Sequence, residues 1–275
     1  MPLLDDLRTT VGSGKVLQVQ VGLFWTGVLV ETDTGIACGL AAALRNPEGE
    51  SEHRPALSAA GHLQELNCQD LMTLVHSESR TEVSVGLATI NALLPRDPCQ
   101  WQELNGADYI VQHGTAKNVA VVGHFPFVEK LRPCFKQLWV LELNPHGDDL
   151  PAARAPEAIP QADLIAITAT TLINRTFDGL MALCRSDAEV MLLGPSTPLS
   201  PLLFSAGLDV LSGTIVEDPR RVLQAISQGC TFGQLVHLGG VRLVTMKRPG
   251  APQGIRPHHD PSNSCAGHIA PASGF

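Results

Sequence analysis

Residues 189–213 read EVMLLGPSTPLSPLLFSAGLDVLSG, and this stretch decides the fold. It begins and ends with short, nearly unbroken apolar runs, which are typical of strands covered on both faces. Between the runs, Ser200 and Pro201 have the pattern of a helix N-cap followed by proline at the first helical position. Gly207 stands where a left-handed residue would end that helix. The stretch therefore predicts a strand, a helix and a second strand of a parallel sheet.

The same alternation extends over residues 115–246. Further apolar runs are NVAVVG (118–123), QLWVLEL (137–143), ADLIAIT (162–168) and VRLVTM (241–246). Helical segments between or after them are TFDGLMALCRS (176–186) and DPRRVLQAISQG (218–229). In the second, Asp218 and Pro219 repeat the pattern of an N-cap followed by proline at the first helical position. Strands that alternate with helices predict a doubly wound α/β domain with a parallel sheet.

The first part of the chain has a different pattern, which predicts a smaller α+β domain. The expected elements are strands within residues 16–24 and 26–41 and helices over residues 67–77 and 79–94. Asn67 is the expected N-cap of the first helix, and Ser79 and Glu82 have the spacing of a capping box at the second. We predict domain boundaries at 1–114 and 115–246, with a disordered tail over 247–275.

Composition and charge exclude several classes of protein. The chain has 275 residues, of which 44% are apolar, as expected for a globular protein with a substantial core. Its net charge is -8 and no cluster of Lys and Arg occurs, so nucleic acid is not an expected partner. No apolar run is long enough for membrane insertion, and the acidic start favours a cytoplasmic protein over a signal peptide. Seven scattered cysteines without a C-x-x-C pair indicate reduced thiols.

Ligands of an open parallel sheet bind beyond the carboxyl ends of its strands, so the residues that follow each apolar run are candidates for a site. The candidate segments are GHFPF (123–127), Glu142 with NPHGDD (144–149), TATTLINRT (168–176), GPSTPLSP (194–201) and SGT (212–214). A loop stiffened by prolines, with free hydroxyl and N–H groups, can form the floor of such a site. Alternatively, Ser196, Thr197 and Ser200 only cap and turn the backbone.

Two side chains suggest specific chemistry. Glu142 follows Gly123 by 19 residues, where a carboxylate can accept ribose hydroxyls in proteins that bind nucleotides or S-adenosylmethionine. GHFPF lacks the second and third glycines of G-x-G-x-x-G, which disfavours a conventional NAD site. His124 could act as a base or a metal ligand, or could bond only to the loop backbone. Asn91 lies in an apolar helix and could face either the core or the second domain.

The tail also contains metal-binding residue types. They are His258, His259, Asp260, Cys265 and His268. On a disordered tail such residues would bind a metal only loosely, and a passive tail is the alternative. His113 and His146 have no metal-motif spacing with their neighbours.

Five phrases, in order, resemble a known family: GLATINAL, VVGHFPF, ELNP, TATTLINRT and LLGPSTPLSPLLFSAGLDVLSG. The family is that of putative heavy-metal chelation domains, and the resemblance spans about residues 10–245. It implies a domain similar to the enolase N-terminal domain, followed by a Rossmann-like domain, with a ligand cleft between them. The ligand-binding residues that the resemblance implies are Asn91, Gly123, His124, Phe125, Pro126, Asn144, Thr170, Asn174, Thr176, Gly194, Pro195, Ser196, Thr197 and Gly213.

We therefore expect a protein that binds a small polar or anionic ligand, such as a metal complex or a chelator-related molecule, in the cleft. The motifs contain no clustered Cys and His residues, so the sequence predicts no particular metal ligands. One alternative is an enzyme with an adenosine-containing cofactor such as S-adenosylmethionine or NAD, held by Glu142, with His124 in acid–base work. A second is a non-catalytic metal carrier or sensor linked to transport. Whether the protein is an enzyme, and whether it forms a homodimer, stays open.

Overall fold

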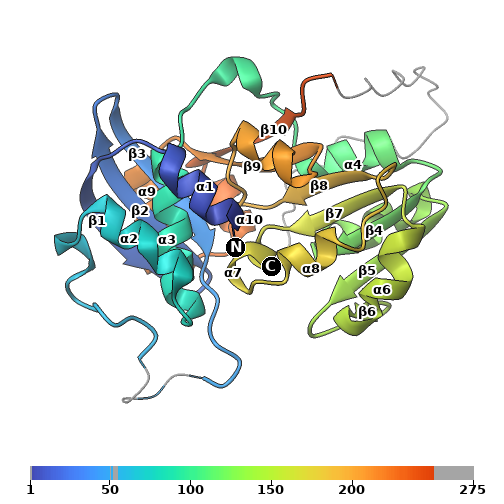
Figure 1. The fold of residues 1–275 in the computed structure, drawn as a ribbon, viewed down its shortest axis with the longest axis horizontal. Helices are drawn as coiled ribbons and strands as arrows, with labels where there is room; N and C mark the ends of the chain where they lie inside the picture. The colour runs from blue at the N-terminus through green and yellow to red at the C-terminus, as the bar shows by residue number, and fades with distance from the viewer. Residues whose placement is uncertain (1, 50, 52–54, 251–275) are drawn as a thin grey trace.

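The computed structural model describes residues 2–49, 51 and 55–250. Two sheets stand next to each other with helices around them (Figure 1). The strands are β1 Lys15–Val21, β2 Trp25–Thr32, β3 Gly35–Ala42, β4 Asn118–Val122, β5 Gln137–Glu142, β6 Leu150–Pro151, β7 Leu164–Thr168, β8 Glu189–Leu193, β9 Val210–Val216 and β10 Val241–Lys247. The α-helices are α1 Pro2–Thr10, α2 Cys68–Thr73, α3 Arg80–Leu93, α4 Gly106–Gly114, α5 Val128–Leu131, α6 Ala155–Ala158, α7 Thr170–Ile173, α8 Phe177–Met181, α9 Pro219–Ser227 and α10 Phe232–His237. The 3-10 helices are η1 Leu63–Glu65, η2 Leu74–His76, η3 Pro98–Gln100, η4 Arg132–Cys134, η5 Ala152–Arg154, η6 Ile159–Gln161 and η7 Pro201–Ala206.

The larger sheet has the strand order β10-β9-β8-β7-β4-β5-β6. Its strands are parallel except for β10, which runs antiparallel to β9. Alternate residues of β4 serve different layers: Val119 and Val121 pack with α4 and α5, while Ala120 and Val122 pack with α6 to α8. The prediction of an α/β fold with a mostly parallel, doubly covered sheet is confirmed. Because β5 and β7 flank β4, the chain leaves β4 in one direction and β7 in the other, which opens a crevice at their carboxyl ends.

The smaller sheet is the predicted meander β1-β2-β3, and it is covered from both parts of the chain. On one face α3 lies so close to β3 that a Cβ on Gly39 would meet the Ala88 carbonyl oxygen at 2.1 Å. On the other face α9, which follows β9 in sequence, packs against β2: a Cβ on Gly27 would meet Leu223 at 2.8 Å and Ile226 at 2.9 Å. The two sheets are therefore tied together through a helix that the later part of the chain contributes.

One hydrophobic cluster runs through both sheets, with Leu7 and Ile90 from the first part and Ile167 and Leu192 from the second. Helix α4 precedes the predicted boundary at residue 114 yet packs against the larger sheet, where Tyr109 donates a hydrogen bond to Glu189 at 2.5 Å. The division into domains stays a prediction. Among the described residues, no helix is both long and apolar enough to cross a membrane.

Three predicted helix caps are confirmed: Asn67 accepts the N–H of Asp70, Ser200 that of Leu202, and Asp218 that of Arg221. The segment after Ser200 is the 3-10 helix η7 rather than an α-helix, and Gly207 ends it with φ of 91°. Sequence patterns gave no indication of α1 or α4.

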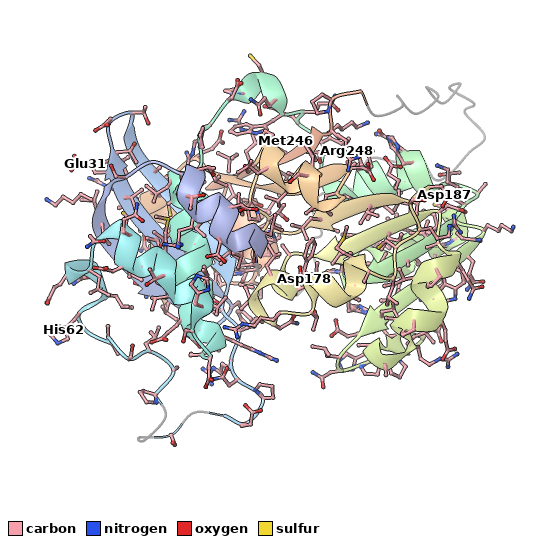
Figure 2. All side chains as sticks on the ribbon, in the orientation of Figure 1. Glu31, His62, Asp178, Asp187, Met246 and Arg248 are labelled. Carbon is pink, nitrogen blue, oxygen red and sulfur yellow. The ribbon has the colours of Figure 1, made fainter. Side chains whose placement is uncertain are left out.

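The first residues after Met246 remain hydrogen-bonded to the rest of the protein. Strand pairing extends to Lys247, and Figure 2 labels Met246 and Arg248 at this end of the described chain. The Arg248 N–H donates to the Asp209 carbonyl at 2.8 Å. The Arg248 guanidinium also donates to the carbonyls of Phe204 and Leu208. The predicted tail thus begins with two held residues, and its segment 251–275, which includes all the tail histidines, lies outside the described residues.

The expected capping box of α3 is only half formed. Ser79 accepts the N–H of Glu82, but the Glu82 carboxylate forms its hydrogen bonds with other residues. It accepts the N–H of Ser58 at 2.7 Å, the Ser58 hydroxyl at 2.6 Å and the Ser77 hydroxyl. Burial alone would raise the pKa of Glu82, but these hydrogen bonds outweigh burial and hold that pKa below its ordinary value. Glu82 therefore fixes two loops against the start of α3.

We expect the Glu82→Gln variant to be less stable than wild type at pH 7 by about 1–2 kcal/mol, because charge-assisted acceptance is lost. Since the folded-state pKa is depressed, this stabilisation is present above the ordinary pKa and is lost as pH falls through the folded-state value. Urea unfolding of both proteins between pH 7 and pH 3 measures the difference. Glu78→Gln, at an exposed position, is the control, and a difference that persists unchanged at low pH contradicts the assignment.

Candidate functional site

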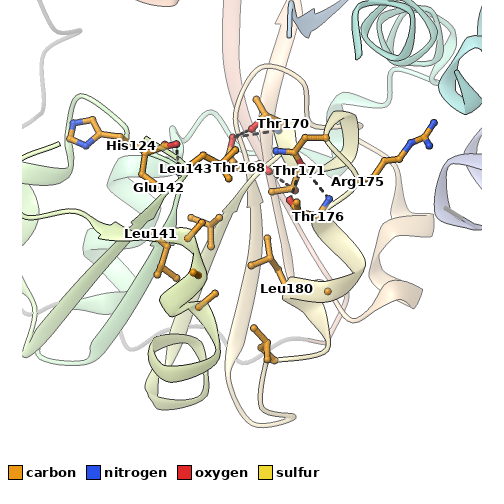
Figure 3. A pocket seen from close by; sticks show the side chains of 18 of the residues that line it. His124, Leu141, Glu142, Leu143, Thr168, Thr170, Thr171, Arg175, Thr176 and Leu180 are labelled. Carbon is orange, nitrogen blue, oxygen red and sulfur yellow. Dashed lines mark hydrogen bonds between the residues drawn. The ribbon is translucent and has the colours of Figure 1, made fainter. Parts of the chain in front are cut away.

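A pocket of about 600 Å³ opens at the carboxyl ends of β4, β5 and β7, in the crevice where the connections diverge (Figure 3). One part of its lining is apolar and comes from β5 and the segment after β6: Leu141, Leu143, Ala152, Ala153, Ala155 and Pro156. A polar edge follows β7: Thr168, Thr170, Thr171, Asn174, Arg175 and Thr176. The volume suits a ligand of about nucleoside or drug size.

Glu142 lies at the end of β5 on the rim of this pocket. Its carboxylate accepts the N–H of His124 at 2.8 Å and the N–H of Leu143 at 2.6 Å. The bond to His124 joins the end of β4 to the end of β5. A carboxylate has about four lone-pair sites, so Glu142 keeps capacity to accept hydroxyl groups of a ligand.

His124 is anchored by a residue that sequence analysis did not identify. Its Nδ1 lies 2.9 Å from an oxygen of Asp149, whose side chain is wholly buried. Asp149 also accepts the N–H of His146 at 3.1 Å. Figure 3 shows the imidazole at the edge of the pocket, turned away from Leu141 and Leu180. In the sequence, only the position of Asp149 within NPHGDD pointed to a role at the site. Its bond to His124 could not be predicted, because the two residues are 25 positions apart.

The loop after β7 carries the polar edge. The hydroxyl oxygens of Thr168 and Thr170 lie 3.0 Å apart, and the Thr176 hydroxyl donates to the Asn174 side chain at 2.7 Å. Arg175 has φ of 63°, a left-handed conformation that is uncommon for a residue other than glycine. Its guanidinium leaves the pocket and donates to the carbonyls of His76 and Ser77. Arg175 therefore ties the pocket edge to the first part of the chain, a role that the sequence did not reveal.

The loop GPSTPLSP lies elsewhere, at the junction of the two sheets. The buried Ser196 hydroxyl oxygen accepts the N–H of Ala42 at 2.8 Å. The Asn91 side-chain amide donates to the carbonyls of Leu40 at 2.8 Å and Ser196 at 3.1 Å. The loop thus binds another part of its own chain, and Asn91 faces both parts at once.

The predicted site residues therefore fall into two groups. The pocket lining includes Gly123, His124, Phe125, Thr170, Asn174, Thr176 and the weaker candidate Glu142. Outside this lining lie Asn91, Pro126, Asn144, Gly194, Pro195, Ser196, Thr197 and Gly213. All lining residues lie between Val122 and Leu183, so the pocket is built by the predicted second domain alone, with Arg175 as its link to the first.

The donor set does not suit a bare metal ion. In the described part of the chain, no three or more His, Cys, Asp or Glu side chains gather as a metal site. Burial raises the pKa of the Cys38 thiol to about 12 and that of Cys184 to about 11, which keeps both thiols protonated and poor as ligands at neutral pH. A metal held at this pocket would have to bring most of its own ligands.

The fold and pocket define a two-sheet α/β protein with a pocket of about 600 Å³ at the carboxyl edge of a mostly parallel sheet. Two sequence families that share the description putative heavy-metal chelation match it, one over residues 105–245 and the other over residues 4–94. The chain belongs to the putative heavy-metal chelation family.

Three similar proteins carry no assigned activity in their names. An uncharacterised protein of Methanocaldococcus jannaschii is 27% identical over 222 residues, which cover 76% of this chain and 82% of that protein. A family protein of unknown function from Desulfitobacterium hafniense has a similar crystal structure, with a TM-score of 0.74 and 25% identity, covering 90% of this chain and 98% of that one. A second, from Pyrococcus horikoshii, has a TM-score of 0.76 at 21% identity, covering 89% of this chain and 98% of that one, and supports the fold alone.

We expect Ser196→Ala to lower the free energy of unfolding by about 1–3 kcal/mol, because the buried N–H of Ala42 would lose its acceptor. Thermal or urea unfolding measures the change. Ser205→Ala removes an exposed hydroxyl of η7 and should stay within about 0.5 kcal/mol of wild type. Equal stability of the two variants would show that the loop does not join the sheets through this bond.

Proposed function

We propose that the protein binds a small polar or anionic organic ligand, including a metal held as a complex by a chelator, in the pocket at the carboxyl ends of β4, β5 and β7. The observation that carries this proposal is the pocket itself, which joins an apolar wall to a polar edge at the point where the strand order reverses. The apolar wall from Leu141 to Pro156 favours a ligand with a carbon skeleton. Hydroxyls at the opposite edge favour carboxylate or carbonyl groups.

The family description, heavy-metal chelation, is compatible with the side chains of the pocket only if the metal binds as a complex with an organic chelator. A bare ion needs several protein ligands in one place, and the pocket supplies one carboxylate, already engaged by two N–H groups, and one imidazole turned outward. A chelator that fills most coordination positions itself removes that requirement. It also provides the apolar and polar surface that the pocket is shaped to contact.

A second candidate is an adenosine-containing cofactor, and Glu142 favours it specifically. Its carboxylate stands at the end of β5, beside Gly123 at the end of the neighbouring strand β4. Gly123 has φ of 100°, a conformation that suits glycine and turns the chain sharply at the pocket edge. The apolar surface beyond β5 could take a purine ring while Glu142 accepts the ribose hydroxyls.

The first test is a thermal-shift panel on wild type and on a variant with the pocket filled. The probes are nickel and zinc salts, citrate and histidine, each metal with each chelator, NAD and S-adenosylmethionine. A probe present at about 100 times its Kd stabilises the fold by about 2.7 kcal/mol. We expect a chelated metal to raise the melting temperature of wild type, and Ala153→Trp to abolish that rise, since Ala153 is an exposed lining residue.

Ala182→Trp is the matched control, because Ala182 is also exposed, directly after α8, but does not line the pocket. It should keep the wild-type response. Stabilisation by the metal salts alone, retained in Ala153→Trp, would contradict binding of a complex in this pocket.

The adenosine candidate has its own test. Glu142→Gln should weaken binding of S-adenosylmethionine or NAD about tenfold, the equivalent of about 1.4 kcal/mol, because the neutral amide loses charge-assisted acceptance. Isothermal titration calorimetry measures the affinity, and Asp148→Asn, an exposed acid of the next loop, is the control. If wild type binds neither compound, the adenosine candidate is eliminated.

A further inference from the structure

Three polar atoms remain without partners at the junction of the two sheets. Among the described residues, several buried side-chain nitrogen or oxygen atoms have no hydrogen-bond partner, and three of them belong to residues around one small cavity. They are Asn91 Oδ1 from α3, Thr197 Oγ1 from the loop after β8, and Thr214 Oγ1 from β9. An unpaired buried polar atom is costly, so the presence of three such atoms on residues that line one cavity requires an explanation.

The hydrogen bonds around the cavity fix how these atoms are presented. The Asn91 amide nitrogen is engaged by the carbonyls of Leu40 and Ser196, so the Oδ1 atom is left to accept from something else. Thr197 is 3% exposed. Its carbonyl oxygen would lie 3.1 Å from a Cβ added to Gly213, so Thr197 lies close to the residue that precedes Thr214. The residues that line the cavity therefore offer two hydroxyls, which donate and accept, and one amide oxygen, which only accepts.

We propose that one ordered water molecule occupies this cavity and cross-links α3, the loop GPSTPLSP and β9. The cavity measures about 20 Å³, enough for one water and too little for an organic ligand or an oxyanion. A water can donate to Asn91 Oδ1 and bond both threonine hydroxyls, within the three or so partners that buried waters have.

Charge around the cavity favours water over an ion. Arg96 also lines it, with its guanidinium bound to the carbonyls of Val216 at 3.2 Å and Cys38 at 3.1 Å. This fixed positive charge opposes a monovalent cation among the three oxygens. An anion would face the acceptor oxygen of Asn91. A neutral molecule that both donates and accepts satisfies all three atoms.

The direction in which a Thr→Val substitution changes the stability of the protein tests the proposed water directly. If the Thr197 hydroxyl is bonded to water, Thr197→Val should raise the unfolding equilibrium constant about fivefold, and Thr214→Val should act in the same direction. If that hydroxyl has no partner, the near-isosteric valine removes a buried polar group and should leave the protein equally stable or stabilise it. Thr26→Val is the matched control, because Thr26 Oγ1 is also buried and unpartnered but does not line this cavity.

A crystal structure of the full chain at a resolution that defines waters completes the test. The expected result is one density peak within hydrogen-bond distance of Thr197 Oγ1 and Asn91 Oδ1. Absence of that peak in a well-ordered junction overturns the proposal, and so do Thr197 and Thr214 variants that are at least as stable as wild type. If one variant fails to fold, the other and the density still decide the result.

Discussion

The side chain of Asn91 makes the contact on which the arrangement of the two sheets depends. From the middle of α3 it donates to β3 through Leu40 and to the loop after β8 through Ser196, while Ser196 in turn accepts from β3. These bonds fix the smaller sheet against the larger one at a buried position, where a lost partner is costly. Helix α9 secures the opposite face of the smaller sheet, so the carboxyl edge of the larger sheet is presented by a rigid frame.

Much of the fold could be predicted because the signals are local. Apolar runs gave the strands, and Asn67, Ser200 and Asp218 marked helix starts through bonds to residues two or three positions away. The site was predictable only in outline. Gly123, Glu142 and the threonines after β7 follow strands, which brings them to one edge, but the partners of Asp149, Arg175 and Ser196 are 25, 98 or 99, and 154 residues away.

The same difference explains why GPSTPLSP resembled a ligand site. Its hydroxyls and prolines are what a preformed binding loop requires, and the structure uses them to bind Ala42 and Asn91. The pocket begins at the neighbouring strand β7, where an apolar wall faces the hydroxyl-rich loop after that strand. Because the described residues include no cluster of metal-ligating side chains, our proposal places a metal in this pocket only as a complex with an organic chelator.

Native mass spectrometry of the freshly purified full chain tests that claim most directly, because it measures the mass of any molecule that stays bound to the protein. Our account predicts one organic adduct per chain, with or without its metal, that remains bound to wild type and is absent from Ala153→Trp. Adducts with the mass of a bare metal ion alone, unchanged in the Ala153 variant, would contradict it.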